Sequence, residues 1–120
     1  MTPSELQGRL AVFAREVALF ARPLFERIET RDIARQLTRA AASAAANHRA
    51  AGRARSHAEF TAKIGVSLEE SDEVVFWLEH LVGLQTRQDP AAGPMMGSAR
   101  ELVAILTASC KTARKRHVGR

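Results

Sequence analysis

The stretch from Arg39 to Glu73 reads RAAASAAANHRAAGRARSHAEFTAKIGVSLEESDE. Its first half consists almost entirely of alanine and arginine, and its second half is rich in acidic residues. Alanine, arginine and glutamate are strong helix formers, so the stretch predicts two helices joined by a very short junction. A plain amphipathic hairpin does not require the polar or flexible residues Ser43, Asn47, Gly52 and Arg53. The stretch therefore indicates a binding or assembly module.

Before this stretch and in its first half, residues recur at alternating spacings of four and three, which is the heptad seam of helix bundles. The first seam consists of Leu6, Leu10, Phe13, Val17, Phe20 and Leu24. The 120 residues of the chain are enough for one core, and no segment has the pattern of a strand. We therefore predict one all-α domain over residues 1–120, an antiparallel up-down-up-down four-helix bundle with helices over about 3–21, 31–54, 57–83 and 99–116.

Three capping boxes mark expected helix starts, each pairing a serine or threonine with a glutamate three residues later: Thr2 with Glu5, Ser56 with Glu59 and Ser98 with Glu101. Pro23 is expected to end or bend the first helix near Ala21. Gly83 is expected to cap the third helix. Residues 84–97 contain two prolines that follow aspartate and glycine, so this segment predicts a loop.

The net charge of +5 is distributed unevenly along the chain. Residues 31–57 sum to +5, residues 58–82 to −5 and residues 111–120 to +5. The sequence shows no signal peptide and no apolar run long enough to span a bilayer. The single cysteine, Cys110, lies on the apolar side of a predicted helix, so we expect a buried structural thiol. These features predict a basic cytoplasmic protein that does not bind membranes.

Arginines gather on one face of the expected helix over 31–54, with alanines between them. A solvated charged face and a face that contacts an anionic partner are both consistent with this pattern. The basic tail is compatible with phosphate binding, and equally with a helix end that complements the helix dipole. The candidate RNA-binding residues are Arg35, Arg39, Arg49, Arg53, Arg55, Lys111, Arg114, Lys115 and Arg116.

The expected helix over 57–83 has a second face beside its core stripe, formed by Val66, Glu70, Glu73, Phe76 and Trp77. Large apolar groups outside a core often mark an interface, so these residues are candidates for an oligomer interface. An acidic face on one protomer could meet an arginine face on another. The alternative is that a bundle helix simply has a broad apolar arc.

Ser43 and Asn47 lie one turn apart on the flank of the core stripe, so we expect them to hydrogen-bond each other or a neighbouring helix. A partly buried asparagine needs partners, and it can thereby fix the register of packed helices. We favour this structural role for Asn47 over a ligand contact.

Catalytic and metal-binding patterns are missing from the sequence. The four histidines and the lone cysteine lack metal-ligand spacing, and no Glu-x-x-His pair of the di-metal bundles occurs. No glycine-rich phosphate loop or nucleophile motif is present. We therefore expect no enzymatic activity, no metal and no cofactor.

The chain resembles the four helix bundle proteins related to the 23S rRNA intervening-sequence protein. Within about residues 30–82 it matches the family pattern R-x-x-x-S-x-x-x-N followed by E-F, and a subgroup pattern that continues with E-E-x-D-E-x-x-x-W-L-E. The matching residues are Arg39, Ser43, Asn47, Arg49, Arg53, Arg55, Ser56, Glu59, Phe60, Glu69, Glu70, Asp72, Glu73 and Trp77. The chain departs from the broader family at Ala50 and Ala51, where that family has Glu-Gly, and from the subgroup at His48, where tyrosine is usual.

This resemblance implies an antiparallel bundle that assembles as a homopentamer and acts on RNA or a ribonucleoprotein. The chain is more distantly similar to accessory proteins of diversity-generating retroelements, which implies a reverse transcriptase as a partner. Two hypotheses follow. The chain binds structured RNA or rRNA through phosphates, or it is a homo-oligomeric scaffold in which the arginine and acidic faces pair and leave little basic surface for RNA.

Overall fold

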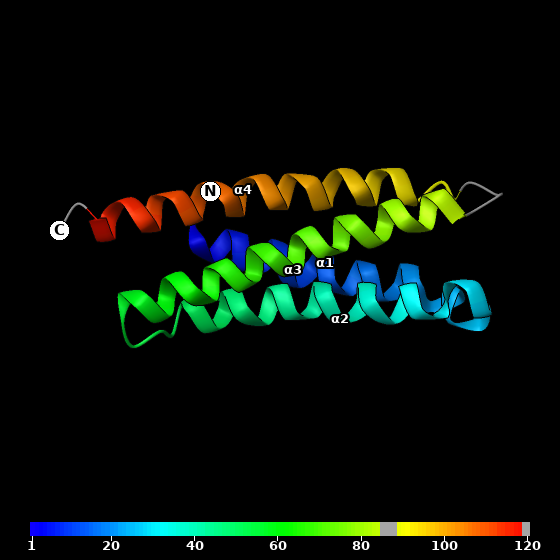
Figure 1. Cartoon of the computed structure of the whole chain (residues 1–120), viewed down its shortest axis with the longest axis horizontal. Coiled ribbons are helices and arrows are strands. Elements are labelled where there is room, and N and C mark those ends of the chain that lie inside the picture. The colour runs from blue at the N-terminus through cyan, green and yellow to red at the C-terminus, as the bar shows by residue number, and fades with distance from the viewer. Residues whose placement is uncertain (85–88, 119–120) are drawn as a thin grey trace.

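The computed structural model describes residues 1–84 and 89–118 as four antiparallel helices in an elongated body measuring 53 × 21 × 20 Å (Figure 1). Helix α1 spans Pro3–Ala21, and the short 3-10 helix η1 spans Arg22–Glu26. Helices α2, α3 and α4 span Ile28–Ala51, His57–Leu84 and Ala92–Val118. Helix α2 packs against α1 and α3, and α4 packs mainly against α3. The predicted all-α four-helix bundle is confirmed.

The start of α1 and its end at η1 follow the sequence signals. The Thr2 hydroxyl accepts a hydrogen bond from the Glu5 backbone N–H at 3.0 Å, and the Glu5 carboxylate accepts one from the Thr2 N–H at 3.3 Å. Pro23 sits in η1, directly after α1 ends at Ala21. The buried Thr30 hydroxyl donates to the Leu24 carbonyl at 2.8 Å, which ties the first turn of α2 to η1.

Small side chains let α2 and α3 approach closely. Ala40, Ala41 and Ala44 are fully or almost fully buried on α2. The buried Ser67 hydroxyl of α3 donates to the Ala44 carbonyl of α2 at 2.8 Å. Such a direct contact between a side chain and the backbone of a neighbouring helix requires a small residue on the facing helix, as the alanine-rich stripe predicts.

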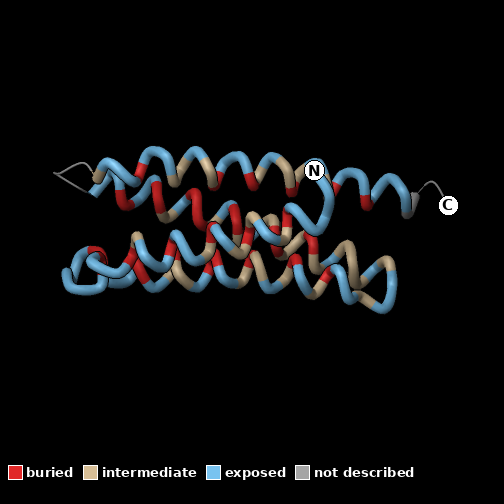
Figure 2. Tube along the Cα trace, turned by 180° about the vertical axis from the view of Figure 1, so that it is seen from behind, coloured by how far each residue is buried: buried red, intermediate tan, exposed pale blue. Residues whose placement is uncertain are grey.

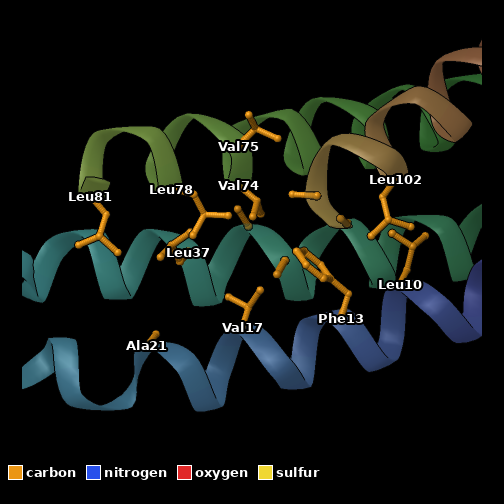
Figure 3. Packing of buried hydrophobic residues seen from close by; sticks show 14 of the residues in the cluster. Leu10, Phe13, Val17, Ala21, Leu37, Val74, Val75, Leu78, Leu81 and Leu102 are labelled. Atoms are coloured by element: carbon orange, nitrogen blue, oxygen red, sulfur yellow. The ribbon is translucent and has the colours of Figure 1, made fainter. Parts of the chain in front are cut away.

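Buried positions face inward between the helices, and exposed positions cover the outside (Figure 2). Side chains from all four helices meet in the main core, as Figure 3 shows around Val17, Leu37 and Leu78. Its largest fully buried side chains include Leu10, Leu37, Leu78, Leu81, Leu102 and Leu106. A smaller cluster holds Ala51, Ile64 and Cys110 with Phe60 against it, so the expected burial of the thiol is confirmed.

The expected start of α4, both expected ends of α2 and the expected cap of α3 are wrong. Helix α4 begins at Ala92 and not at residue 99, so Ser98 lies within the helix and does not cap it. At the start of this helix, the Asp89 carboxylate instead accepts a hydrogen bond from the Ala91 N–H at 2.9 Å. Pro94 is compatible with the helix, because the N–H it lacks would have no helical partner in the first turn.

Helix α2 occupies 28–51 and not 31–54, because only the extended residue Arg27 separates it from η1 and the chain turns away at Gly52. The next two residues form turns, in which Arg53 and Ala54 donate backbone hydrogen bonds to Ala50 and Ala51. Gly83 lies within α3, which continues to Leu84, so Gly83 is not a cap. The loop expected over residues 84–97 includes residues 85–88, which lie outside the described residues.

Candidate nucleic-acid interface

Basic segments that are far apart in the sequence meet at one end of the bundle. The C-terminal ends of α2 and α4 and the start of α3 all lie at the end marked C in Figure 1. The His57 ring and the Ala113 carbonyl lie 2.9 Å apart, so the first turn of α3 contacts α4 there. Residues 49–63 and 110–116 carry eight cationic side chains and one carboxylate, Glu59. We call these cations the basic end: Arg49, Arg53, Arg55, Lys63, Lys111, Arg114, Lys115 and Arg116.

Most cations of the basic end have no acidic partner among the described residues. Arg55 is paired, but loosely: its guanidinium lies 3.7 Å from Glu59, and its side chain is 90% exposed. Arg49, Arg53 and the four cations of α4 make no ion pair within the described part of the chain, and all six are exposed. These side chains can therefore contact phosphates without first giving up an internal partner.

Two of the candidate RNA-binding arginines lie away from the basic end. Arg35 pairs with Asp32 of the same helix at 3.1 Å. Because α2 rises ~1.5 Å per residue, Arg35 lies about 20 Å along the axis from Arg49. Arg39 points to α3 and contacts two carboxylates there. The structure thus gathers seven of the nine candidates and adds Lys63, which sequence reasoning missed.

Arg39 is the centre of an ion-pair network between α2 and α3. Its guanidinium donates to Oε1 of Glu73 at 2.8 Å and to Oε1 of Glu70 at 3.4 Å, and it lies 3.3 Å from Oε2 of Glu70 without hydrogen-bond geometry. The Trp77 indole N–H donates to the same Glu73 oxygen at 3.2 Å. Burial alone would raise the pKa of Glu73, but the hydrogen bonds from Trp77 and Arg39 outweigh it and lower that pKa. The same two carboxylates raise the pKa of Arg39.

This network changes the interpretation of the predicted interface. Glu70 and Glu73 were expected to face an arginine of another protomer, but within one chain they already bind Arg39. Phe76 points away from the core and is 56% exposed. Its ring lies 5.0 Å from that of Trp77 and 6.0 Å, stacked, from that of His80. The surface available to a partner is therefore aromatic, with the exposed Glu69 and Asp72 beside it.

Ser43 and Asn47 contact each other, as expected. The Asn47 side-chain amide donates to the Ser43 hydroxyl at 3.1 Å and to the Ser43 carbonyl at 2.9 Å. Both hydrogen bonds stay within α2, so they do not fix its register against a neighbour. The buried polar residue next to Asn47 is His48, which is 7% exposed.

Sequence reasoning missed His48 and its partner Gln7. His48 continues the buried series of α2 at alternating spacings of four and three, after Leu37, Ala41 and Ala44 and before Ala51. That spacing is the feature of the sequence from which the burial of His48 could have been predicted. The His48 Nδ1 lies 2.6 Å from the Gln7 Oε1 of α1. Burial lowers the pKa of His48 below its ordinary value.

The remaining motif residues have structural positions. The Ser56 hydroxyl accepts from the Glu59 N–H at 3.1 Å at the start of α3, as the second capping box predicts. Among the described residues, no group of three or more histidine, cysteine or acidic side chains is arranged to hold a metal ion. Within residues 1–84 and 89–118, no helix combines the length and apolarity needed to cross a bilayer.

Comparisons with known proteins agree with the fold. No protein-family model matches the sequence, and no curated protein matches it. A crystal structure from Bacteroides thetaiotaomicron, of a protein with unknown function from the S23 ribosomal protein family, is similar with a TM-score of 0.84. The similarity covers 92% of this chain and 99% of that one at 23% sequence identity. At this identity the likeness shows the fold alone.

Proposed function

We propose that the chain is a non-enzymatic, cytoplasmic, oligomeric bundle that binds structured RNA through phosphate contacts at its basic end. The observation that carries this proposal is the gathering of eight cations and one carboxylate from three helices at one end of the molecule. Exposed cations without internal partners are the groups that release counterions from a nucleic-acid backbone. The similar protein from the S23 ribosomal protein family is consistent with this proposal through its family name.

The proposed mode of recognition is shape-directed. The exposed ring of Phe76 and the partly buried ring of Trp77 lie on α3 away from the basic end, so these two rings offer bases no stacking platform there. Phosphate contacts position a protein on a folded RNA without reading its bases. Repetition of the basic end around an oligomer would raise affinity through multivalency.

A fluorescence-anisotropy titration tests this proposal. The purified chain is titrated against a structured rRNA hairpin and a DNA duplex of equal charge at several salt concentrations. We expect tighter binding to RNA, with the logarithm of affinity falling linearly with the logarithm of salt concentration. The double variant Arg114→Gln/Lys115→Gln should bind more weakly and reduce the slope by about 1.5, at ~0.7–0.9 per lost phosphate contact.

The matched control is Arg15→Gln/Arg22→Gln, which removes the same charge from exposed arginines of α1 and η1 that have no ion pair among the described residues. It should leave the slope almost unchanged. Equal losses in both double variants would mean that net charge alone attracts RNA, and the proposed interface would be wrong.

The exposed aromatic face favours a second function, a homo-oligomeric scaffold or accessory subunit for a protein such as a reverse transcriptase. Phe76 on its outer surface is the kind of group that anchors an interface. We propose that the chain self-associates through this face, as a homopentamer. Light scattering should give five times the 13.1 kDa of one chain, and Phe76→Ser should give a smaller species. If the unchanged chain and the Phe76→Ser variant were both monomers, this face would be rejected as an interface.

A further inference from the structure

A cavity of about 380 Å³ opens beside the basic end, between the start of α1, the end of α2 and the facing sides of α3 and α4. Its apolar lining includes Leu6, Phe60, Ile64 and Ile105. The volume falls within the range of about 300–1,000 Å³ that is typical of small-molecule sites. Apolar walls of this kind suit the uncharged, apolar part of a ligand, such as an alkyl chain or an aromatic ring.

Inside this cavity, the orientation of Gln7 fixes the tautomer of His48. The Gln7 side-chain amide donates its N–H to the Ala45 carbonyl at 3.3 Å, so its oxygen faces His48. That oxygen lies 2.6 Å from the His48 Nδ1 and can only accept, so Nδ1 carries the proton. In the neutral ring, Nε2 is therefore a hydrogen-bond acceptor. His48 lines the cavity, and its Nε2 has no hydrogen-bond partner among the described residues.

Positive charge lies at the edge of the same cavity. Arg49 and Arg53 line it, are exposed, and have no ion pair in the part of the chain that the structure describes. They lie one helical turn apart on the last turn of α2 and the residues after it. None of the described residues that line the cavity is acidic. A ligand here therefore needs an anionic group at the edge and a hydrogen-bond donor inside.

We propose that this cavity binds a nucleoside monophosphate unit. The base lies against Phe60 and Ile64 and donates an N–H to the His48 Nε2, while the phosphate binds Arg49 and Arg53. A fatty acid would satisfy the arginines and the apolar walls, but it has no donor for His48. The unit is either a free nucleotide or an unstacked nucleotide of an RNA, because single-stranded RNA presents such bases. The inference rests on the proposed function in one respect, since Arg49 and Arg53 belong to both.

Calorimetric titration with the four ribonucleoside 5′-monophosphates, with the matching nucleosides and with ribose 5-phosphate tests the site. We expect at least one monophosphate to bind, and its nucleoside and ribose 5-phosphate to bind about tenfold more weakly or not at all, because each lacks one of the two recognised groups. In a ¹⁵N spectrum of labelled histidine, the Nε2 resonance of His48 should shift on saturation. No binding by any monophosphate, or binding without a change at His48, would overturn the proposal.

Three variants separate this site from general phosphate binding. Ser109→Phe fills the cavity from α4 and should abolish nucleotide binding, while leaving the affinity for a fully base-paired RNA unchanged. Arg49→Gln/Arg53→Gln should weaken the binding of nucleotide and of base-paired RNA. The control Arg15→Gln/Arg22→Gln should weaken neither kind of binding. Circular dichroism verifies that each variant is folded. RNA binding without nucleotide binding would reject the cavity and leave the proposed function standing, and the reverse result would reject only the RNA interface.

Discussion

Arg39 contributes to stability more than to binding, because its guanidinium joins α2 to two partly buried carboxylates of α3. The side chains of Glu70 and Glu73 are 18% and 34% exposed, so the loss of Arg39 would leave both short of a partner. We expect Arg39→Met to lower the free energy of unfolding by about 1 kcal/mol. The control Arg35→Met breaks a pair whose side chains are 61% and 69% exposed, and should cost only a few tenths, about 0.3 kcal/mol.

Urea unfolding at several pH values measures this difference. The contribution of Arg39 should be present above the ordinary glutamate pKa and disappear as the pH falls through the lowered pKa of Glu73. RNA affinity should not change in Arg39→Met, in contrast to the basic-end variants. A loss of RNA affinity without a loss of stability would assign Arg39 to the interface instead.

His48 makes the stability of the fold depend on pH at higher pH values than Glu73 does. Burial lowers its pKa in the folded state, so below the ordinary histidine pKa of about 6.5 the unfolded chain binds a proton more readily. Stability should therefore fall as the pH drops from about 6.5 to the lowered pKa of His48, and this group causes no further loss below it.

The variant His48→Gln, which does not titrate, should have a flatter dependence over this range, measured by thermal unfolding between about pH 5 and 7.5. His80→Gln is a control at a histidine exposed on α3. Identical profiles for His48→Gln and the unchanged chain would contradict the buried neutral imidazole, and with it the acceptor on which the nucleotide site depends.

At the scale of elements, the seam between α2 and α3 depends on the size of the alanines in it. Ala44 is 2% exposed, and its carbonyl accepts the Ser67 hydroxyl. We expect Ala44→Leu to push the helices apart and to cost about 1–3 kcal/mol, as overpacking does. Ala42→Leu places the same side chain on the exposed side of α2 and should change stability by less than about 0.5 kcal/mol. Similar costs at both positions would show that the seam has room.

The sequence predicts those elements whose signals are local. Thr2, Glu5 and Pro23 fix the bounds of α1, because each acts through a backbone group within a few residues. The start of α4 was missed because Pro94, Gly93 and Gly97 suggest a loop, although the first turn of the helix accommodates Gly93 and Pro94, and Gly97 lies in the next turn. Arg39 could not be assigned to Glu70 and Glu73 from the sequence, because that contact depends on how α2 and α3 are rotated against each other.

For the molecule as a whole, charge and exposed aromatic surface lie in different places. The basic end lies where α2 and α4 finish and α3 begins, so the negative poles of two helix dipoles and the positive pole of one lie near its cations. The two negative poles offset part of the mutual repulsion of the cations, and the positive pole of α3 reduces this effect. The aromatic face lies further along α3, around Phe76. Under the proposed function, this separation would leave the basic end free for RNA while the aromatic face serves assembly.

Hydrogen exchange followed by mass spectrometry should resolve these two surfaces. An RNA hairpin at about ten times its dissociation constant leaves about a tenth of the protein free, so exchange in the last turns of α2 and α4 should slow about tenfold where they open locally. Residues 69–80 should respond to protein concentration instead, because there a second copy covers the backbone. The variant Phe76→Ser should remove the concentration effect and keep the effect of RNA. Protection by RNA centred on residues 69–80 would mean that the aromatic face, and not the basic end, contacts the nucleic acid.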